Sequence, residues 1–63
     1  MDFSSFAHVV VFDGTSAYVI PSFDLDYEIG QNEVEPVKGF NDFNKACEFE
    51  ETYNAEATNN GRY

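Results

Sequence analysis

The hydrophobic pattern of the first third of the chain is that of a β-hairpin. Residues 6–13 (FAHVVVFD) are rich in β-branched and aromatic side chains and predict a strand, and residues 16–20 (SAYVI) predict the strand that returns beside it. Asp13 ends the first segment and Gly14 follows it, and this dipeptide favours a type I′ turn, in which both central residues have a positive φ. Pro21 has no N–H to donate, so it ends the second strand or places it at a sheet edge.

The next segment, residues 23–29 (FDLDYEI), alternates between apolar and acidic residues at every position. Side chains of a β-strand point to opposite faces with a period of two, so the alternation predicts a third strand, or a continuation of the second past a bulge. One face of this strand would be apolar. The other face would carry a row of three carboxylates, from Asp24, Asp26 and Glu28.

The rest of the chain predicts a turn, a weak strand and a helix. Residues 30–32 (GQN) predict the turn, and residues 33–38 (EVEPVK) predict a short irregular strand that Pro36 restricts to a sheet edge. Asn41 is a suitable N-cap for a helix over residues 42–57, and residues 59–61 (NNG) give a stop signal. We therefore expect a small α+β domain: an antiparallel sheet of two to four strands that begins with a hairpin, with one C-terminal helix packed on it.

The apolar positions predict a core between the sheet and that helix. The helical stripe that would face the sheet consists of Phe43, Ala46, Cys47, Tyr53 and Ala57, with Phe49 at its border. We expect the mostly buried residues to be Val9, Val11, Val19, Leu25, Phe43, Cys47 and Tyr53. Both faces of the first strand are apolar, which predicts a central strand, a strand covered by a second layer, or a strand in a dimer contact.

Length and composition indicate one folded domain, residues 1–63, with a flexible tail at about 58–63. Apolar residues make up 43% of the chain and aromatic residues 17%, which argues against disorder. Cys47 is the only cysteine, so no intrachain disulfide can form, and a free thiol fits a reducing compartment. The N-terminus has no basic region, and the apolar run at 9–12 is too short to span a bilayer. We expect a cytoplasmic protein.

No combination of residues in the sequence predicts catalysis. His8 is the only histidine, and its neighbours at period two, Phe6 and Val10, favour a packing or edge position. Cys47 belongs to the inner helical stripe, where a buried and inert thiol is usual. The chain has no glycine-rich phosphate loop, and so short a domain has little room for a pocket that would shift carboxyl pKa values. We expect no enzymatic activity and no cofactor.

The acids of residues 24–35 match a calcium-binding EF-hand loop only in part. They would fill the acidic loop positions, but the loop position that must be glycine is Ile29, and Gly30 comes one residue late. The residues before the loop are β-like, and Pro36 interrupts those after it, whereas helices flank an EF-hand loop. We therefore expect no metal site.

Charge is the most unusual property of the composition. Twelve acids and three bases give a formal net charge of −9 at pH 7, above the about 2 to 8 that solubility asks of a small domain. Such a surface repels nucleic acid and anionic membranes, and it attracts a basic protein surface. Five acids and no base lie from Asp24 to Glu35, whereas an ordinary solvated face mixes both signs.

An exposed acidic strand would match the spacing of phosphates in a nucleic acid. Side chains on one strand face repeat every ~6.6–6.8 Å, and every second phosphate of a DNA strand rises by about the same distance. The acids would then occupy the places of alternate phosphates in a groove built for DNA. We predict that the partner is contacted by Asp24, Asp26, Glu28, Glu33, Glu35, Glu48 and Glu51. The alternative is that these acids only solubilise the domain.

In size, charge and the order of strand, strand and helix, the chain resembles the very short acidic early proteins with which bacteriophages disable host enzymes. These include DNA mimics that block polymerases, repair glycosylases, nucleases, or restriction and CRISPR effectors. The resemblance implies a non-catalytic inhibitor that binds a basic, nucleic-acid-binding groove of a host protein in the host cytoplasm. The competing interpretation is a structural or adaptor module. Such a module would bind a partner, or a second copy of itself, through apolar contacts or by adding strand 33–38 to a sheet.

Overall fold

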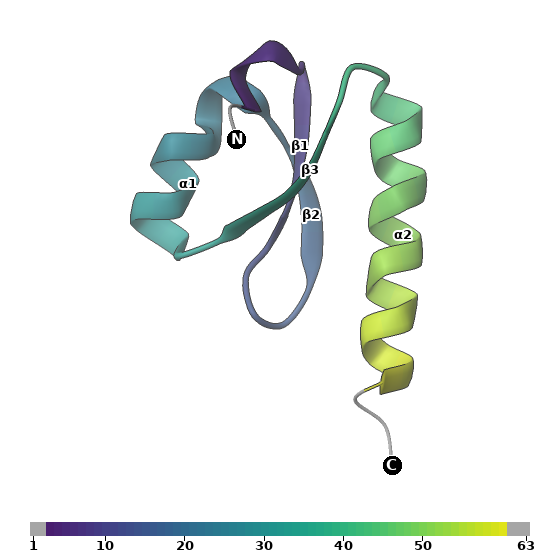
Figure 1. Cartoon of the computed structure of the whole chain (residues 1–63). Helices are drawn as coiled ribbons and strands as arrows, with labels where there is room; N and C mark the ends of the chain where they lie inside the picture. Colours follow the sequence, from purple (N-terminus) through teal and green to yellow (C-terminus); the bar gives the residue numbers. More distant parts are fainter. Residues whose placement is uncertain (1–2, 61–63) are drawn as a thin grey trace.

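The computed structural model describes residues 3–60 and shows a small α+β domain (Figure 1). The strands are β1 (His8–Phe12), β2 (Ala17–Pro21) and β3 (Glu35–Phe40), and the helices are α1 (Leu25–Asn32) and α2 (Phe43–Asn60). Two short 3-10 helices, η1 (Phe3–Ser5) and η2 (Ser22–Asp24), precede β1 and α1. The expected fold class, a small antiparallel sheet that begins with a hairpin and carries a C-terminal helix, is confirmed.

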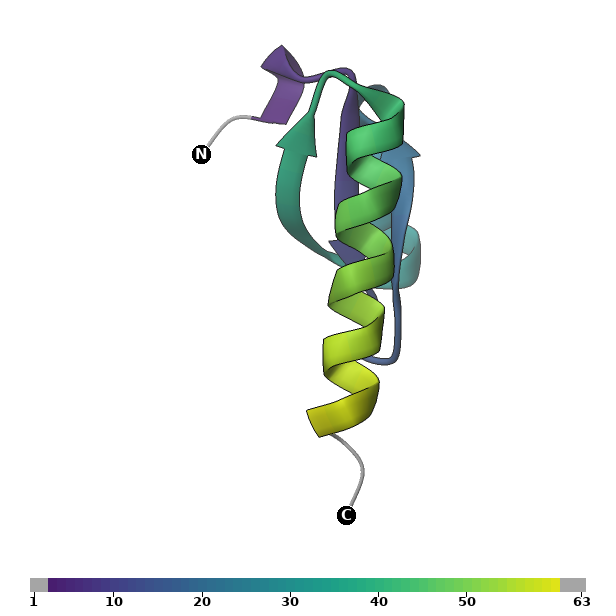
Figure 2. The ribbon, with the colours of Figure 1, turned by 90° about the vertical axis from the view of Figure 1, so that its right-hand side faces the viewer.

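The strand order β2-β1-β3 explains why a second helix is present. β1 pairs antiparallel with both neighbours, so β2 and β3 run parallel to each other on opposite sides of it. Two parallel strands cannot be joined by a tight turn and need a crossover of about a dozen residues, usually with a helix. Residues 22–34, with η2 and α1, form this crossover and cover one face of the sheet (Figure 1). Figure 2 shows α2 lying lengthwise over the other face.

β1 is apolar on both faces because both faces are covered. Val9 and Val11 belong to a buried cluster under the crossover, whereas Val10 packs against Ala46 of α2. All three valines are fully buried. Of the three alternatives for this strand, the structure shows a central strand that is covered on both faces.

The hairpin is confirmed, but its turn is not of type I′. Within the loop only Gly14 has a positive φ, of 97°. Asp13 donates its N–H to the carbonyl of Ser16 at 3.1 Å, and its carboxylate accepts the N–H groups of Ser16 and Thr15, both at 2.8 Å. These two backbone bonds, that of Ser16 first, hold the pKa of Asp13 below its usual value. Asp13 therefore stabilises the turn with its side chain.

Residues 23–29 are helical, and the prediction of a third strand there is wrong. η2 and α1 contain the segment, and α1 continues through the predicted turn at 30–32 until Glu33 adopts a left-handed conformation with φ 54°. The alternating pattern is compatible with a helix. Phe23 and Tyr27, like Leu25 and Ile29, are four residues apart, which is the spacing of neighbours on one helix face.

β3 is an edge strand, as expected from Pro36, although it begins and ends two residues later than predicted. Its register with β1 is interrupted between Pro36 and Lys38. Gly39 lies directly under Phe6, since a Cβ built on Gly39 would be 2.3 Å from a carbon of the Phe6 ring. A glycine at this position allows Phe6 to cover the end of the strand.

α2 has close to the predicted extent, but a different residue caps it. The carboxylate of Asp42 accepts the N–H of Asn44 at 2.9 Å, whereas the side chain of Asn41 accepts the N–H of Ala7 at 3.1 Å. The prediction of Asn41 as the cap is therefore wrong. α2 continues to Asn60, so the beginning of the predicted tail at 58–63 is helical. Residues 61–63, with the end of the stop signal, lie outside the described residues.

The inner stripe of α2 is rotated relative to the prediction. Ala46 is fully buried, and Phe49 packs with it against the sheet, so Phe49 lies inside the stripe and not at its border. Phe43 was expected in the core but is 55% exposed, and its ring meets His8 edge to face with centroids 5.2 Å apart. Of the other core predictions, Val9 and Val11 are buried, and Val19, Leu25, Cys47 and Tyr53 are half-buried. The side chain of Ala57 lies outside the described residues.

Candidate functional site

The crossover between β2 and β3 exposes a large amount of apolar surface. None of the eight residues of α1 is buried. Phe23 in η2 is 85% exposed, and in α1 Tyr27 is 64% and Ile29 41% exposed. The described part of α2 contributes one large exposed apolar side chain, Phe43. Several large apolar side chains exposed in one short segment are a common feature of contact sites.

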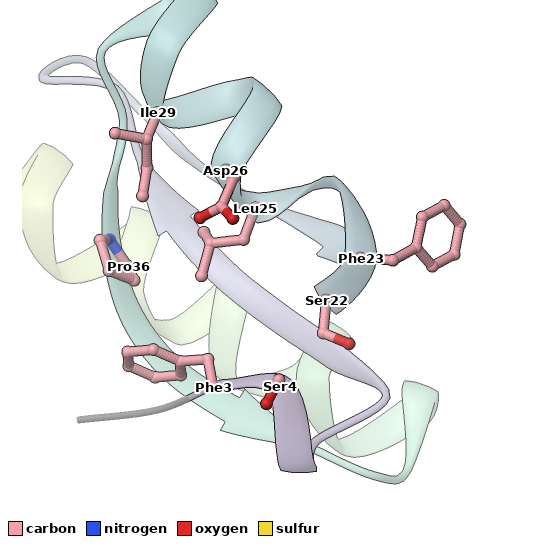
Figure 3. Close-up of a pocket in the computed structure, with 8 residues that line it drawn as sticks. All are labelled: Phe3, Ser4, Ser22, Phe23, Leu25, Asp26, Ile29 and Pro36. Carbon is pink, nitrogen blue, oxygen red and sulfur yellow. The ribbon is translucent and has the colours of Figure 1, made fainter.

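A pocket of about 390 Å³ lies beside this surface (Figure 3). Four elements form it: η1, η2, α1 and β3. The residues that line it are Phe3, Ser4, Ser22, Phe23, Leu25, Asp26, Ile29 and Pro36. In Figure 3, the side chains of Phe3, Leu25, Ile29 and Pro36 converge on the hollow, whereas the Phe23 ring points away from it. The pocket is therefore a hollow of mixed character, in which apolar side chains lie beside two serines and one carboxylate, that of Asp26.

The seven predicted contact acids are divided between opposite layers of the molecule. The crossover and the start of β3 carry five of them: Asp24, Asp26, Glu28, Glu33 and Glu35. Glu48 and Glu51 are exposed on α2, on the other side of the sheet (Figure 1). The seven acids therefore do not form one face.

The three acids of the alternating segment do not form a row either. A helix turns by about 100° per residue, so Asp24 and Glu28 fall near one side of it and Asp26 falls on another. Asp24 and Glu28 are half-buried, and Asp26 is exposed. The expected match to alternate phosphates required a strand, and it is lost because the segment is a crossover helix.

Glu28 helps to hold α1 on the sheet. Its carboxylate accepts the hydroxyl of Tyr18 in β2 at 3.2 Å and the side-chain amide of Asn32 at 2.6 Å. Partial burial, together with the hydrogen bond to the Glu28 carboxylate, raises the pKa of the Tyr18 hydroxyl above its usual value. Glu28 therefore has a structural contact that the alternating pattern gave no reason to expect.

The crossover layer carries charge of one sign. From Ser22 to Val37 the chain contains no Lys or Arg. The ammonium group of Lys38 lies over the rings of Phe40 and Phe49, 5.5 and 5.6 Å from their centroids, on the side of α2. No charged side chain in the described part of the chain is buried. The acids of the crossover therefore give this layer a negative surface.

Within residues 3–60 the structure contains neither a metal-binding cluster nor a membrane-spanning helix. No group of three or more His, Cys, Asp or Glu side chains is arranged to hold a metal ion there, and neither described helix is long and apolar enough to cross a membrane. The pocket combines apolar side chains, two serines and one carboxylate. This combination is suited to binding through apolar contact with one oriented charge.

The pocket could hardly be predicted from the sequence, because its residues meet only in three dimensions. Phe3, Ser22 and Pro36 are far apart in the chain, and the crossover brings them around Leu25 and Ile29. One available signal was the aromatic content. The chain has seven Phe and four Tyr, and none of those in the described residues is fully buried.

Comparison of the chain with protein-family models, with curated proteins and with solved structures found no match. The function must therefore be inferred from the residues and the geometry of the chain itself.

Proposed function

We propose that the protein is a non-catalytic binding protein that docks its crossover face, residues 22–35, on a basic surface of a partner protein. The observation that carries this proposal is the combination of exposed apolar side chains and acids in one crossover segment that has no base. A face that served solubility alone would carry the acids without the exposed rings of Phe23 and Tyr27.

The charge supports a basic partner. A net charge of −9 attracts a positive surface over a long range and can raise the association rate by about 10- to 1,000-fold at low salt. Exposed carboxylates add little affinity one by one. Affinity would therefore come mainly from the apolar side chains, and the acids would supply rate and selectivity. The same field repels nucleic acid and anionic membranes.

An enzyme that binds nucleic acid is the kind of partner that fits this face best. Its groove is basic because it must neutralise phosphates, and an acidic protein that fills the groove excludes the nucleic acid. The proposed role is thus inhibition by stoichiometric binding, as in the acidic phage proteins that the chain resembles in size and charge. The target would be a host RNA polymerase, nuclease, or repair or defence enzyme in the host cytoplasm.

Strand addition to the sheet is a weaker alternative, because both edges are obstructed. At the β2 edge, the side chain of Asn54 accepts the N–H of Ala17 at 2.7 Å and donates to its carbonyl at 3.0 Å. Pro21 ends the same strand and has no N–H. At the β3 edge, Pro36 lacks an N–H and the register is irregular. Prolines and irregular pairing are features by which proteins protect sheet edges.

Two matched charge-reversal variants test the proposal. Affinity capture from a bacterial lysate, with mass spectrometry, supplies the partner, and the affinity of the purified pair is then measured at several salt concentrations. Asp24→Lys with Asp26→Lys reverses two charges on the crossover face, and Glu48→Lys with Glu51→Lys makes the same change on α2. We expect the first variant to abolish binding and the second to slow association only. Both should melt near the temperature of the parent.

Equal losses in the two variants would show that only total charge matters, and they would overturn the assignment to the crossover face. Undiminished affinity in both variants, or an affinity that does not change with ionic strength, would overturn the basic partner itself.

A further inference from the structure

The pocket beside α1 supports a more specific mode of docking, which rests on the proposed function. We infer that the pocket receives an apolar side chain from a basic segment of the partner, and that a neighbouring Lys or Arg of that segment pairs with Asp26. The ligand is thus a stretch of polypeptide in which an aliphatic or aromatic residue is flanked by cations.

The lining of the pocket determines the apolar part of this ligand. Phe3, Leu25, Ile29 and Pro36 come from three elements and converge on the hollow (Figure 3). Leu25 packs against the buried cluster beneath the crossover, whereas Ile29 is 41% exposed and can be covered by a ligand. A hollow of about 390 Å³ is at the small end of the ~300–1,000 Å³ range of ligand pockets, a size that suits one or two side chains.

Asp26 determines the charged part. It is the only charged residue of the lining, and it is exposed to solvent. Asp26 and Ile29 are three residues apart, so they lie on neighbouring positions of one side of α1. A cation next to the inserted apolar side chain would form a charge-assisted hydrogen bond with this carboxylate. Glu33 and Glu35, both exposed nearby in the chain, add negative potential.

Two other occupants fit this face less well. A small molecule would fill the pocket but leave Phe23 and Tyr27 at 85% and 64% exposure, whereas a polypeptide segment can continue over them. A second copy of this chain carries the same net charge of −9, so it would place acids against acids. Charge complementarity therefore selects a basic polypeptide.

Titration of the isotope-labelled full chain with synthetic peptides, followed by nuclear magnetic resonance, tests the inference. The probe is the end-blocked hexapeptide Lys-Lys-Leu-Phe-Lys-Lys. One comparator has Ser-Ser at its centre, and the other keeps Leu-Phe but has Glu in place of every Lys. We expect the probe to bind about tenfold more tightly than either comparator. The largest shifts should occur at the backbone amides of Phe3, Leu25 and Ile29.

Two matched pairs of variants sharpen the test. Ile29→Ser should weaken binding of the probe about tenfold, whereas Phe43→Ser, the same new side chain at an exposed position of α2, should weaken it no more than about twofold. Asp26→Asn should weaken it about fivefold, and Glu48→Gln, the same loss of one charge on α2, no more than about twofold. The asparagine and glutamine variants keep the side-chain volume, and unchanged dispersion of the amide spectrum verifies the fold of each.

Equal binding of the Leu-Phe and Ser-Ser peptides, shifts centred on α2, or no binding of any peptide would overturn the pocket assignment. These results would leave the docking of the crossover face standing, because that docking is tested with charge-reversal variants and the whole partner. Conversely, a partner that binds Asp24→Lys with Asp26→Lys undiminished would overturn the proposed function even where the pocket binds the peptide.

Discussion

On one face of the sheet, α2 closes over β1 with Ala46 and Phe49, whereas on the other face the crossover leaves Phe23 and Tyr27 almost uncovered. Both layers rest on the same central strand, in which Val10 faces α2 and Val9 faces the crossover. The difference therefore lies in the covering helices and not in the sheet. It assigns α2 a larger part in the core, and it leaves the crossover helix as the more exposed layer, on which the proposed docking rests.

The lengths of the helices agree with this division. α2 has 18 residues, and α1 has eight, which is too short for a helix to be stable without tertiary contacts. α1 is held by the packing of Leu25 on the core and by the hydrogen bond between Tyr18 and Glu28. Segments with few buried contacts open locally at low cost. We therefore expect the crossover to open locally while α2 and the sheet stay folded.

The largest effect on stability is expected at α2, where the half-buried ring of Phe49 is compared with the exposed ring of Phe43. Phe49→Ala removes a ring that packs between Phe40 and Tyr53, with centroid distances of 5.4 and 6.0 Å, and should lower the free energy of unfolding by about 3 kcal/mol. Phe43→Ala removes a ring that is 55% exposed and should cost about 1 kcal/mol. Urea denaturation followed by circular dichroism measures both. A larger loss for Phe43→Ala would mean that α2 presents a different face to the sheet.

Substitution of two glycines by alanine, Gly39 in β3 and Gly30 in α1, should change the stability of the chain in opposite directions. A Cβ at Gly39 would lie 2.3 Å from the Phe6 ring, so Gly39→Ala displaces that ring and should cost about 2 kcal/mol. Gly30 lies in α1, and a Cβ there would meet nothing within 4 Å. Gly30→Ala should therefore stabilise the chain by up to about 1 kcal/mol through helix propensity. Urea denaturation measures the stability of both variants. Equal losses of stability at the two positions would contradict the packing of Phe6 on β3.

The parts of the fold that could be predicted from the sequence have local signals. The β-branched run at Val9–Val11 marks a strand buried on both faces, Gly14 marks the hairpin, and Pro36 marks an edge. Residues 40–60 contain neither proline nor glycine, and this long uninterrupted interval marks α2. Each of these signals depends on residues within a few positions of one another, so no knowledge of strand order was needed.

The crossover could not be predicted in this way, because strand order decides it. Seven alternating residues satisfy the strand period of two and also contain two pairs at the helical spacing of four, Phe23 with Tyr27 and Leu25 with Ile29. Only the position of β3 beside β1 makes a helix necessary there. For the same reason, the acidic character of the crossover could be predicted, but the pocket and the separation of Glu48 from Asp26 could not.

A third test concerns the polar contact that joins α2 to β2. The side chain of Asn54 pairs with both backbone groups of Ala17, and Asn54→Leu would leave them without this partner, at a cost of about 1 kcal/mol. Asn44→Leu is the matched control, because Asn44 is exposed on the same helix and should change stability little. The variant at Asn54 also frees the β2 edge, so size-exclusion chromatography should detect self-association in it and not in the control. Monomeric behaviour in both variants would show that Asn54 does not protect this edge.

The smallest effect is expected at the corresponding polar contact of the crossover, between Tyr18 and Glu28. Tyr18→Phe removes the hydroxyl that donates to Glu28 at 3.2 Å and keeps the ring that packs on the core. The melting temperature should fall only slightly at pH 7. Amide hydrogen exchange should become faster in α1 and stay unchanged in α2. Faster exchange in both helices would show that the crossover and α2 do not open independently, contrary to the proposed division.

The same contact predicts a dependence on alkaline pH. Partial burial and the neighbouring Glu28 raise the pKa of Tyr18 above the usual value of 10.0, so the folded chain keeps the hydroxyl protonated where the unfolded chain loses the proton. The stabilising contribution is therefore complete below pH 10, and it is lost as the pH rises through the raised pKa. Denaturation curves recorded from about pH 8 to 11.5 should show a steeper loss for the parent than for Tyr18→Phe, which has no hydroxyl at this position. Parallel losses in the two proteins would show that Tyr18 is as free to ionise in the folded chain as in the unfolded one, and that α1 is not held by this hydrogen bond.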